Sequence, residues 1–124
     1  MAHYAFIDEN NVVTETIVGK DETDLSENWE EHYAQFRPGM KCLRYSYNTI
    51  HNTHLLGGIP FRGNAACPGS IYDEELDVFL TPKPHPDFIL NTEKFIWEPP
   101  FPKPDSGLWR FDLESFNWVE FDVE

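Results

Sequence analysis

The sequence predicts an α+β fold that is mainly β, made of small antiparallel sheets of short hairpins, one helix near residues 27–36 and extended proline-rich linkers. Three observations predict this class. An eight-residue pattern occurs three times, at residues 72–79, 90–97 and 111–118. Seven of the ten prolines stand in the two spacers between these copies. Near the N-terminus, two runs of β-branched and aromatic residues flank a group of turn-forming residues.

Each copy of the pattern reads as an apolar residue, Asp or Asn, any residue, Glu, three further residues and a large aromatic residue. An Asp or Asn after an apolar residue accepts a hydrogen bond from the backbone two residues on and starts a tight turn. We therefore expect each copy to be a small hairpin with aromatic side chains on both strands. The glutamates at the fourth position are interpreted as part of the turn: Glu75, Glu93 and Glu114.

The two spacers, 81–86 and 98–104, are predicted to be extended connectors that lie over a surface. Proline has no N–H for a central ladder and favours extended geometry in the residue before it. We expect nearby indoles to pack on these prolines, with Trp97 and Trp118 mostly buried. The alternative is an aromatic groove that binds a proline-rich peptide. The candidate interface residues of this region are Trp97, Pro99, Pro100, Trp109 and Trp118.

The N-terminal segment predicts a hairpin, because residues 4–7 and 12–18 are rich in β-branched and aromatic residues and residues 8–11 supply turn chemistry. Gly19 ends the second strand. Residues 40–47 alternate imperfectly between polar and apolar and predict a further strand.

A helix is predicted between these strands, with Ser26 as its N-cap. Trp29, Tyr33 and Phe36 recur at spacings of four and three, so we expect the helix to bury an aromatic stripe. Pro38 and the glycine after it end the helix.

Residues 48–70 predict a long loop, because they hold several glycines and prolines and little periodicity. Long ordered loops on compact domains are often interaction surfaces. The ordered part is expected at residues 59–62, with Phe61 as the anchor. The predicted organisation is an N-terminal region of residues 1–70 and a C-terminal region of residues 71–124 that contains the three hairpins.

The formal net charge of -13 argues against nucleic acid or an anionic membrane as the main partner. The charge is uneven, because residues 32–72 contain no acid and four bases: Arg37, Lys41, Arg44 and Arg62. An acidic partner or the acidic end of a neighbouring copy is expected to dock there. Arg44 and Arg62 are favoured as interface residues because arginine binds a carboxylate through two parallel hydrogen bonds. The alternative is that these bases neutralise acids of their own chain.

No apolar run approaches the roughly 18 residues of a membrane span, and the N-terminus lacks a signal-peptide pattern. We therefore expect a soluble protein made in the cytoplasm. Its two cysteines, Cys42 and Cys67, are expected to be free buried thiols.

No catalytic, cofactor or metal site is predicted. A structural zinc site needs four converging ligands, whereas the sequence offers one short-spaced pair, His51 and His54, and no CxxC. Most carboxylates stand in acidic runs, and nothing marks a pair in different environments for acid–base chemistry. Phosphate-binding glycine motifs are absent from the sequence. The chain is expected not to be an enzyme.

Several stretches carry a resemblance to a known family: residues 1–22, 44–49, 61–66, 89–91 and 97–100. They resemble small virion proteins of marine tailed phages, especially those that infect cyanobacteria. The C-terminal half resembles a module that those phages reuse, with a Tyr-Asp hairpin, a Pro-x-Pro linker, an Ile-Leu-Asn strand and a Trp-Glu-Pro-Pro linker. Residues 64–69 depart from the aromatic-Ala-Gly stretch of that pattern. The resemblance implies a structural role in the particle and no catalytic residue.

The leading hypothesis is therefore a non-enzymatic virion accessory protein, on the particle surface as capsid decoration or cement. The alternatives are a tail-associated structural protein or tail-fibre assembly chaperone, and a carbohydrate- or peptide-binding module. The expected partners are the major capsid or tail protein and further copies of the chain. The expected location is the virion, after synthesis in the host cytoplasm.

Overall fold

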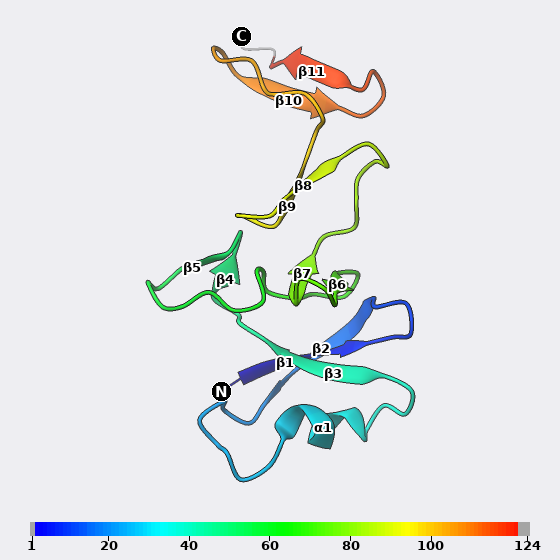
Figure 1. The fold of residues 1–124 in the computed structure, drawn as a ribbon, viewed down its shortest axis with the longest axis vertical. Coiled ribbons are helices and arrows are strands. Elements are labelled where there is room, and N and C mark those ends of the chain that lie inside the picture. The colour runs from blue at the N-terminus through cyan, green and yellow to red at the C-terminus, as the bar shows by residue number, and fades with distance from the viewer. Residues whose placement is uncertain (1, 122–124) are drawn as a thin grey trace.

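The structure is a computed structural model that describes residues 2–121. It is mainly β, with small antiparallel sheets of short hairpins and one short helix, as predicted. Figure 1 shows an elongated molecule, with the helix at one end and the last hairpin at the other. The elements are β1 (Ala2–Ile7), β2 (Val13–Gly19), α1 (Trp29–Ala34), β3 (Lys41–Tyr45), β4 (Thr49–Ile50), β5 (Thr53–His54), β6 (Ile71–Asp73), β7 (Val78–Leu80), β8 (Ile89–Asn91), β9 (Ile96–Glu98), β10 (Trp109–Asp112) and β11 (Asn117–Glu120).

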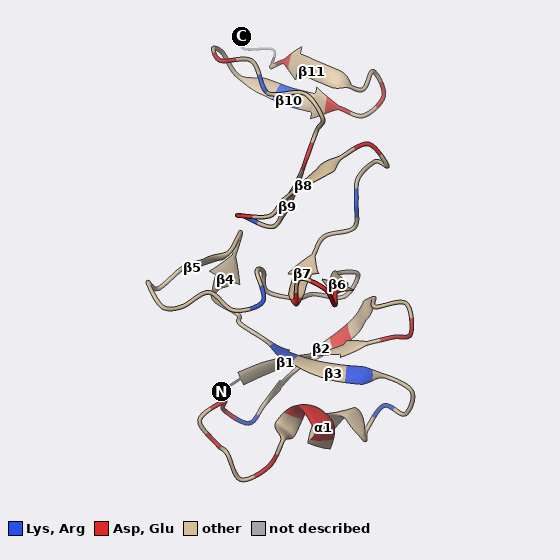
Figure 2. Ribbon diagram, viewed as in Figure 1, with Lys and Arg blue, Asp and Glu red and all other residues tan. Residues whose placement is uncertain are grey.

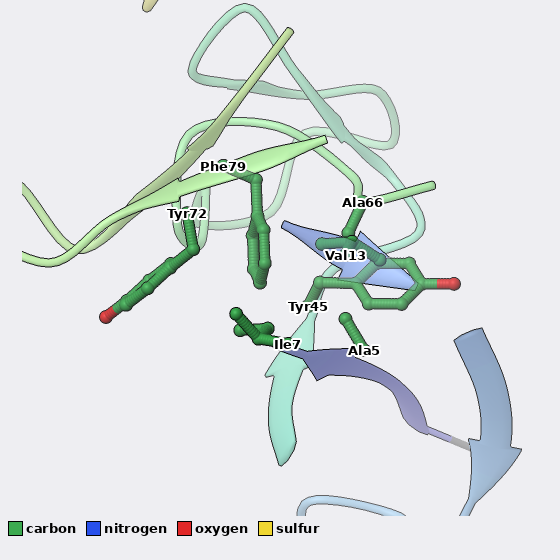
Figure 3. Packing of buried hydrophobic residues seen from close by; sticks show 7 residues of the cluster. All are labelled: Ala5, Ile7, Val13, Tyr45, Ala66, Tyr72 and Phe79. Atoms are coloured by element: carbon green, nitrogen blue, oxygen red, sulfur yellow. The ribbon is translucent and has the colours of Figure 1, made fainter. Parts of the chain in front are cut away.

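The largest sheet has three antiparallel strands in the order β2-β1-β3, which confirms the N-terminal hairpin and the following strand. The central strand β1 is buried on both faces, and successive side chains of a strand point to opposite faces. One face packs against α1 through Ala2, Tyr4, Phe6 and Cys42. The other face packs toward the first repeat hairpin (Figure 3), in a cluster of Ala5, Ile7, Val13, Tyr45, Ala66, Tyr72 and Phe79. This cluster joins residues on both sides of the predicted division between residues 70 and 71.

The helix is shorter than predicted, and Ser26 is not its N-cap. Asn28 caps α1, because its side-chain oxygen accepts a hydrogen bond from the Glu31 N–H at 3.2 Å. The Ser26 hydroxyl instead donates to Asp24 at 2.6 Å, in a local turn. The Asp24 carbonyl also accepts the indole N–H of Trp29 at 3.0 Å. These contacts hold the segment before Asn28 out of the helix.

The predicted aromatic stripe is only partly buried. Trp29 and Tyr33 pack against the sheet, and the Tyr33 hydroxyl accepts a hydrogen bond from the Lys20 N–H at 3.0 Å. Phe36 is exposed, because it lies beyond the last helical residue, Ala34, where the chain has begun to turn. Two members of the stripe, Trp29 and Tyr33, are therefore partly buried against the core.

Each copy of the eight-residue pattern is a hairpin, as predicted: β6–β7, β8–β9 and β10–β11. The first and last residues of the pattern face each other across the strands, in the pairs Tyr72↔Phe79, Leu90↔Trp97 and Phe111↔Trp118. The second residue accepts the backbone N–H three residues on, as in Asp73 from Leu76, Asn91 from Lys94 and Asp112 from Ser115. The sixth residue has positive φ: Asp77 54°, Phe95 52° and Phe116 50°.

The carboxylate of the glutamate in the pattern takes no part in the turn, although the Glu93 backbone N–H donates to Asn91 at 2.9 Å. The carboxylates of Glu75, Glu93 and Glu114 are exposed and accept no hydrogen bond from residues 2–121. The Asp or Asn two residues earlier accepts the turn hydrogen bonds, so the interpretation of these glutamates as turn residues holds for their position and not for their carboxylates.

The segment 48–70 is not a free loop. It holds the small hairpin β4–β5, and the Ala65 N–H donates to the Thr49 carbonyl at 2.7 Å. The fully buried Thr49 hydroxyl accepts from the Phe61 N–H at 3.2 Å. Gly63 has φ +74°, and a Cβ there would lie 2.9 Å from the Phe95 ring, so only glycine fits between hairpins at this point.

The repeat hairpins continue away from the N-terminal sheet in chain order (Figure 1). Residues 81–88 and 99–108, which join them, contain no helix or strand. Burial falls along this stack, because Phe88 is the only core residue beyond Leu80 in the described chain. Within residues 2–121, the one helix is too short and too polar to cross a membrane.

Candidate interaction surface

Acidic and basic residues are spread unevenly over the elements (Figure 2). Three of the four bases of the acid-free segment pair with acids of the same chain, as the alternative expected. Arg37 pairs with Glu15 and Lys41 pairs with Glu74, both on the exposed surface. The hydrogen bond and charge of Glu15 raise the pKa of Arg37, and those of Lys41 lower the pKa of Glu74.

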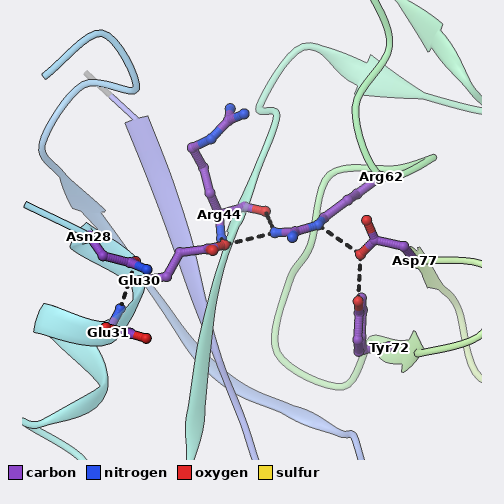
Figure 4. Close-up of polar contacts among 7 residues, drawn as sticks. All are labelled: Asn28, Glu30, Glu31, Arg44, Arg62, Tyr72 and Asp77. Carbon is purple, nitrogen blue, oxygen red and sulfur yellow. Dashed lines mark hydrogen bonds and ion pairs between the residues drawn. The ribbon is translucent and has the colours of Figure 1, made fainter. Parts of the chain in front are cut away.

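Arg62 is the most enclosed of these bases, with 14% of its side chain exposed. Its guanidinium donates to Glu30 at 2.8 Å, to the Arg44 carbonyl at 2.8 Å and to Asp77 at 2.9 Å (Figure 4). Asp77 also accepts the Tyr72 hydroxyl. Burial works against the charge of Arg62, but the hydrogen bond and charge of Glu30 raise its pKa overall. Arg62 therefore joins α1, β3 and the first repeat hairpin inside the molecule.

Arg44 differs from the other three bases because its guanidinium forms no ion pair with any residue from 2 to 121. Its backbone N–H donates to Glu30 at 2.7 Å, while its side chain points away from the polar network (Figure 4). The guanidinium stacks on the Phe61 ring at 3.9 Å from the ring centroid. This contact fixes the guanidinium plane without using its N–H donors.

Arg44 lines a hollow of about 170 Å³ between the start of β1, the end of β3 and the β4–β5 hairpin. Its walls carry several donor groups, from His3, Ser46, Tyr47, Asn48 and His54, and one acid, Glu22. In the described chain, the side chains of Ser46, Tyr47 and Asn48 make no hydrogen bond. Hydrogen-bond donors without a partner in the described chain therefore surround this hollow.

The tautomer of a neutral His54 ring follows from its hydrogen bonds. Its Nδ1 accepts hydrogen bonds from the Leu56 and Gly58 N–H groups, both at 3.1 Å. The neutral ring must therefore carry its proton on Nε2, which is a donor. His3 is held in place by stacking on Tyr47, with ring centroids 5.0 Å apart.

A second hollow, of about 290 Å³, lies on the other side of Arg44, toward α1. It shares Arg44 and Glu22 with the first hollow. Its walls include four acids, Glu22, Asp24, Glu27 and Glu30, and two bases, Arg44 and Arg62. Arg44 thus separates an acidic hollow from one rich in donors.

The segment 48–61 contains no Asp, Glu, Lys or Arg. It presents several large apolar side chains to solvent, and Leu56 and Ile59 are 78% and 88% exposed. Ile50 and Leu55 are also exposed. In the ribbon, β4–β5 projects to one side of the stack (Figure 1). An uncharged apolar surface next to an unpaired arginine is typical of a protein contact.

The tryptophans of the repeat region, Trp97, Trp109 and Trp118, are neither fully buried nor exposed, which agrees with the expectation that Trp97 and Trp118 are largely covered. The Trp97 and Trp118 indoles donate to the backbone carbonyls of Thr81 at 2.8 Å and Phe101 at 3.0 Å. The Trp109 indole donates to the Ser106 carbonyl at 2.6 Å.

The proline-rich linker also borders a hollow of about 540 Å³. Phe101, Trp118 and Lys103 line it, together with Glu98, Pro99 and Pro102. Pro100 is half-buried and lies outside this lining. The structure therefore brings Pro99 and Trp118 together, with Trp97 and Trp109 in other surroundings.

Neither cysteine is in a disulfide, and only Cys42 is buried. Burial raises the pKa of the Cys42 thiol to about 12. Cys67 is exposed, which corrects the expectation of two buried thiols. No group of three or more potential metal ligands occurs among residues 2–121.

Comparison of the chain with family models, with curated proteins and with solved structures finds no match.

Sequence reasoning singled out Arg44 and Phe61, and it missed the donors around them. Ser46, Asn48 and His54 carry no motif, and their convergence depends on how β4–β5 folds back beside β3. One sequence feature does point to this surface: residues 32–72 contain no acid. This signal marks the segment and does not distinguish Arg44 from Arg62.

Proposed function

We propose that this protein is a non-enzymatic structural protein of a phage virion, attached to the outer surface of the capsid as decoration or cement. The observation that carries the proposal is the uncharged segment 48–61 with its exposed apolar side chains. Such a surface is unfavourable in water unless another protein covers it. The likeness of the sequence to small virion proteins of marine tailed phages supports the same function.

The elongated stack of hairpins supports attachment along a neighbouring subunit (Figure 1). A chain of 124 residues buries a modest core, and here the outer hairpins contribute little to it. Contact with the major capsid protein would bury more apolar surface. A tail protein offers the same kind of surface and is the alternative partner.

The proline-rich linkers act in this proposal as extended connectors between hairpins. Thr81 and Phe101 each precede a Pro-Lys-Pro sequence, and each receives the indole N–H of the hairpin that follows. The Lys83 ammonium also lies 5.3 Å from the centre of the Trp97 ring. These contacts hold each linker against its hairpin.

Quantitative mass spectrometry of purified virions of the encoding phage tests the proposal. We expect the protein at a constant ratio to the major capsid protein. If it is present in infected cells but missing from purified particles, it is an assembly factor such as a tail-fibre chaperone, and the structural proposal is wrong. Electron cryo-microscopy of the same particles separates capsid from tail.

One observation favours a second candidate, a carbohydrate- or peptide-binding module. The hollow of about 540 Å³ beside Trp118 is lined by aromatic and proline rings, which suit a sugar ring or a proline-rich peptide. Titration of tryptophan fluorescence with host-surface polysaccharide and with a proline-rich peptide tests it. A saturable change that Trp118→Leu abolishes would establish this second function.

A further inference from the structure

We propose that the hollow at Arg44 binds the carboxylate of one Asp or Glu side chain from a neighbouring protein of the particle, with the apolar segment 48–61 covering the residues beside that acid. The inference rests on the proposed function for the source of the carboxylate. The carboxylate site itself stands on the geometry around Arg44.

Arg44 is prepared for an anion. Its guanidinium carbon lies over the Phe61 ring, 3.9 Å from the ring centroid, and has no acidic partner among the described residues, although the chain contains 22 acids. Because stacking uses the ring face of the guanidinium, the N–H groups at its edge stay free for a carboxylate. Arg62, one of whose N–H groups bonds the Arg44 backbone carbonyl, is already occupied by Glu30 and Asp77.

The other walls of the hollow supply donors that a carboxylate needs. The hydroxyl groups of Ser46 and Tyr47 and the amide of Asn48 form no side-chain hydrogen bond within residues 2–121. The Nε2 of His54 is a donor because Nδ1 accepts two backbone N–H groups. A carboxylate has two oxygens that accept several hydrogen bonds, so it matches this set.

Size and charge define the ligand further. A space of about 170 Å³ admits a single side-chain group and no extended ligand. The net charge of -13 opposes the approach of a multiply charged anion such as phosphate more than that of a single carboxylate. Glu22 is the one acid on the wall, and it is exposed. It therefore competes weakly with an incoming acid for Arg44.

The apolar segment beside the hollow explains why the carboxylate would come from a protein. Leu55 and Leu56 directly follow His54, so they lie next to the hollow with their side chains in solvent. Burial of these side chains by a partner excludes water around the ion pair. A desolvated charge-assisted pair is stronger than an exposed one. The partner segment is thus expected to carry an acid flanked by apolar residues.

The first test is an NMR titration of the full chain with N-acetyl-glutamate amide, a capped glutamate residue. We expect saturable shifts of the Arg44 Nε–H and of the amides of Tyr47 and His54. Arg44→Gln should weaken binding about tenfold or more, because it removes both charge-assisted hydrogen bonds. Arg44→Lys keeps the charge but loses the planar fork, so it should weaken binding by a smaller factor. Arg110→Gln, on the exposed face of the last hairpin, is the matched control and should change nothing.

Two further arms identify the ligand chemistry. N-acetyl-glutamine amide, which has the same shape without the charge, should cause no saturable shift. Glu22→Gln should tighten binding about two- to fivefold, because it removes the competing carboxylate. Absence of saturable shifts up to about 10 mM capped glutamate, with the variants folded, would overturn the proposal. Equal or tighter binding of inorganic phosphate would overturn the assignment to a carboxylate.

The second test uses particles. Particles are mixed with added wild-type protein or the Arg44→Gln variant, and occupancy is measured after purification. If wild-type protein is absent from native virions, the proposed function fails, while the titration still decides the carboxylate site. If the wild-type protein binds and Arg44→Gln binds equally well across a range of salt, the docking proposal fails alone.

Discussion

At the scale of single residues, Arg62 is a charged group that connects three elements. It donates to Glu30 of α1, to the carbonyl of Arg44 on β3 and to Asp77 of the first repeat hairpin. We expect Arg62→Met to lower the free energy of unfolding by about 1 to 3 kcal/mol, less than the loss of a fully buried pair, because Asp77 stays half in water. Urea denaturation measures this change.

The matched control is Arg37→Met, which removes the exposed pair with Glu15. We expect a much smaller loss of stability there than for Arg62→Met, because water already screens both charges. Equal losses for the two variants would show that the enclosure of Arg62 has no energetic consequence.

Two tyrosines should lose their hydroxyl protons at a higher pH than an ordinary tyrosine. Burial raises the pKa of Tyr4 to about 12, and burial with the hydrogen bond to Asp77 raises the pKa of Tyr72 to about 12. In the unfolded chain both titrate near 10. The folded state therefore binds more protons between about pH 10 and 12, so stability is complete below pH 10 and falls as pH rises through that window.

Tyrosinate absorbance of the native protein measures this effect. We expect a late step that Tyr72→Phe and Tyr4→Phe each reduce. Complete titration of all tyrosines near pH 10 while the fold persists would contradict the burial of these phenols.

At the scale of the hairpin, the turn depends on the second residue of the repeated pattern and not on its glutamate. Asp112 accepts from both the Ser115 N–H and the Ser115 hydroxyl, and these hydrogen bonds lower its pKa. We expect Asp112→Ala to destabilise the last hairpin measurably, because both hydrogen bonds from Ser115 are lost. Glu114→Ala should have an effect near zero. Local hydrogen exchange of β10 and β11 compares the two variants, and an equal effect would restore the glutamate to the turn.

The indole contacts with the linkers give a second prediction at this scale. Trp97 is half-buried, so Trp97→Ala should cost about 2 to 3 kcal/mol, less than the 3 to 5 kcal/mol of a fully buried indole. Trp97→Phe keeps a ring but loses the hydrogen bond to Thr81, and should cost about 0.5 to 1.5 kcal/mol. Reversible denaturation of both variants checks the order, and a larger loss for Trp97→Phe would contradict it.

The hairpins could be predicted because their determinants are local. The residues that start each turn and the apolar residues that pair across it lie within eight positions of one another. The helix start was missed because Ser26 and Asn28 are both good capping residues, and the contacts of Asp24 decide between them. Sequence alone does not contain those contacts.

The sequence indicated the stretch of chain that holds the candidate site, but not which of its residues form the site. Arg44 and Arg62 look alike in the sequence, and the difference arises because Glu30 and Asp77, far apart in the chain, both reach Arg62. The pairing of Ala65 with Thr49, which holds the loop after β5 against the β4–β5 hairpin, is likewise not encoded in any short pattern.

At the scale of the whole molecule, local stability should decrease along the stack. The two core clusters involve β1, β3, α1 and the first repeat hairpin, while the later hairpins rest on half-buried rings around Phe88. Native-state hydrogen exchange should show the highest protection in β1 and β3 and the lowest in β10 and β11. Uniform protection across all strands would show a single cooperative unit instead.

The succession of hairpins also determines how the molecule would respond to a pulling force. β11 lies at the far end from the N-terminal sheet, and the indole of each later hairpin is tied to the linker just before it (Figure 1). Tension applied at the far end would therefore peel off the last hairpin first, then the one before it, while the sheet around β1 stayed folded. A protein held to a surface by its middle segment would lengthen in steps and absorb the load before its attachment gave way.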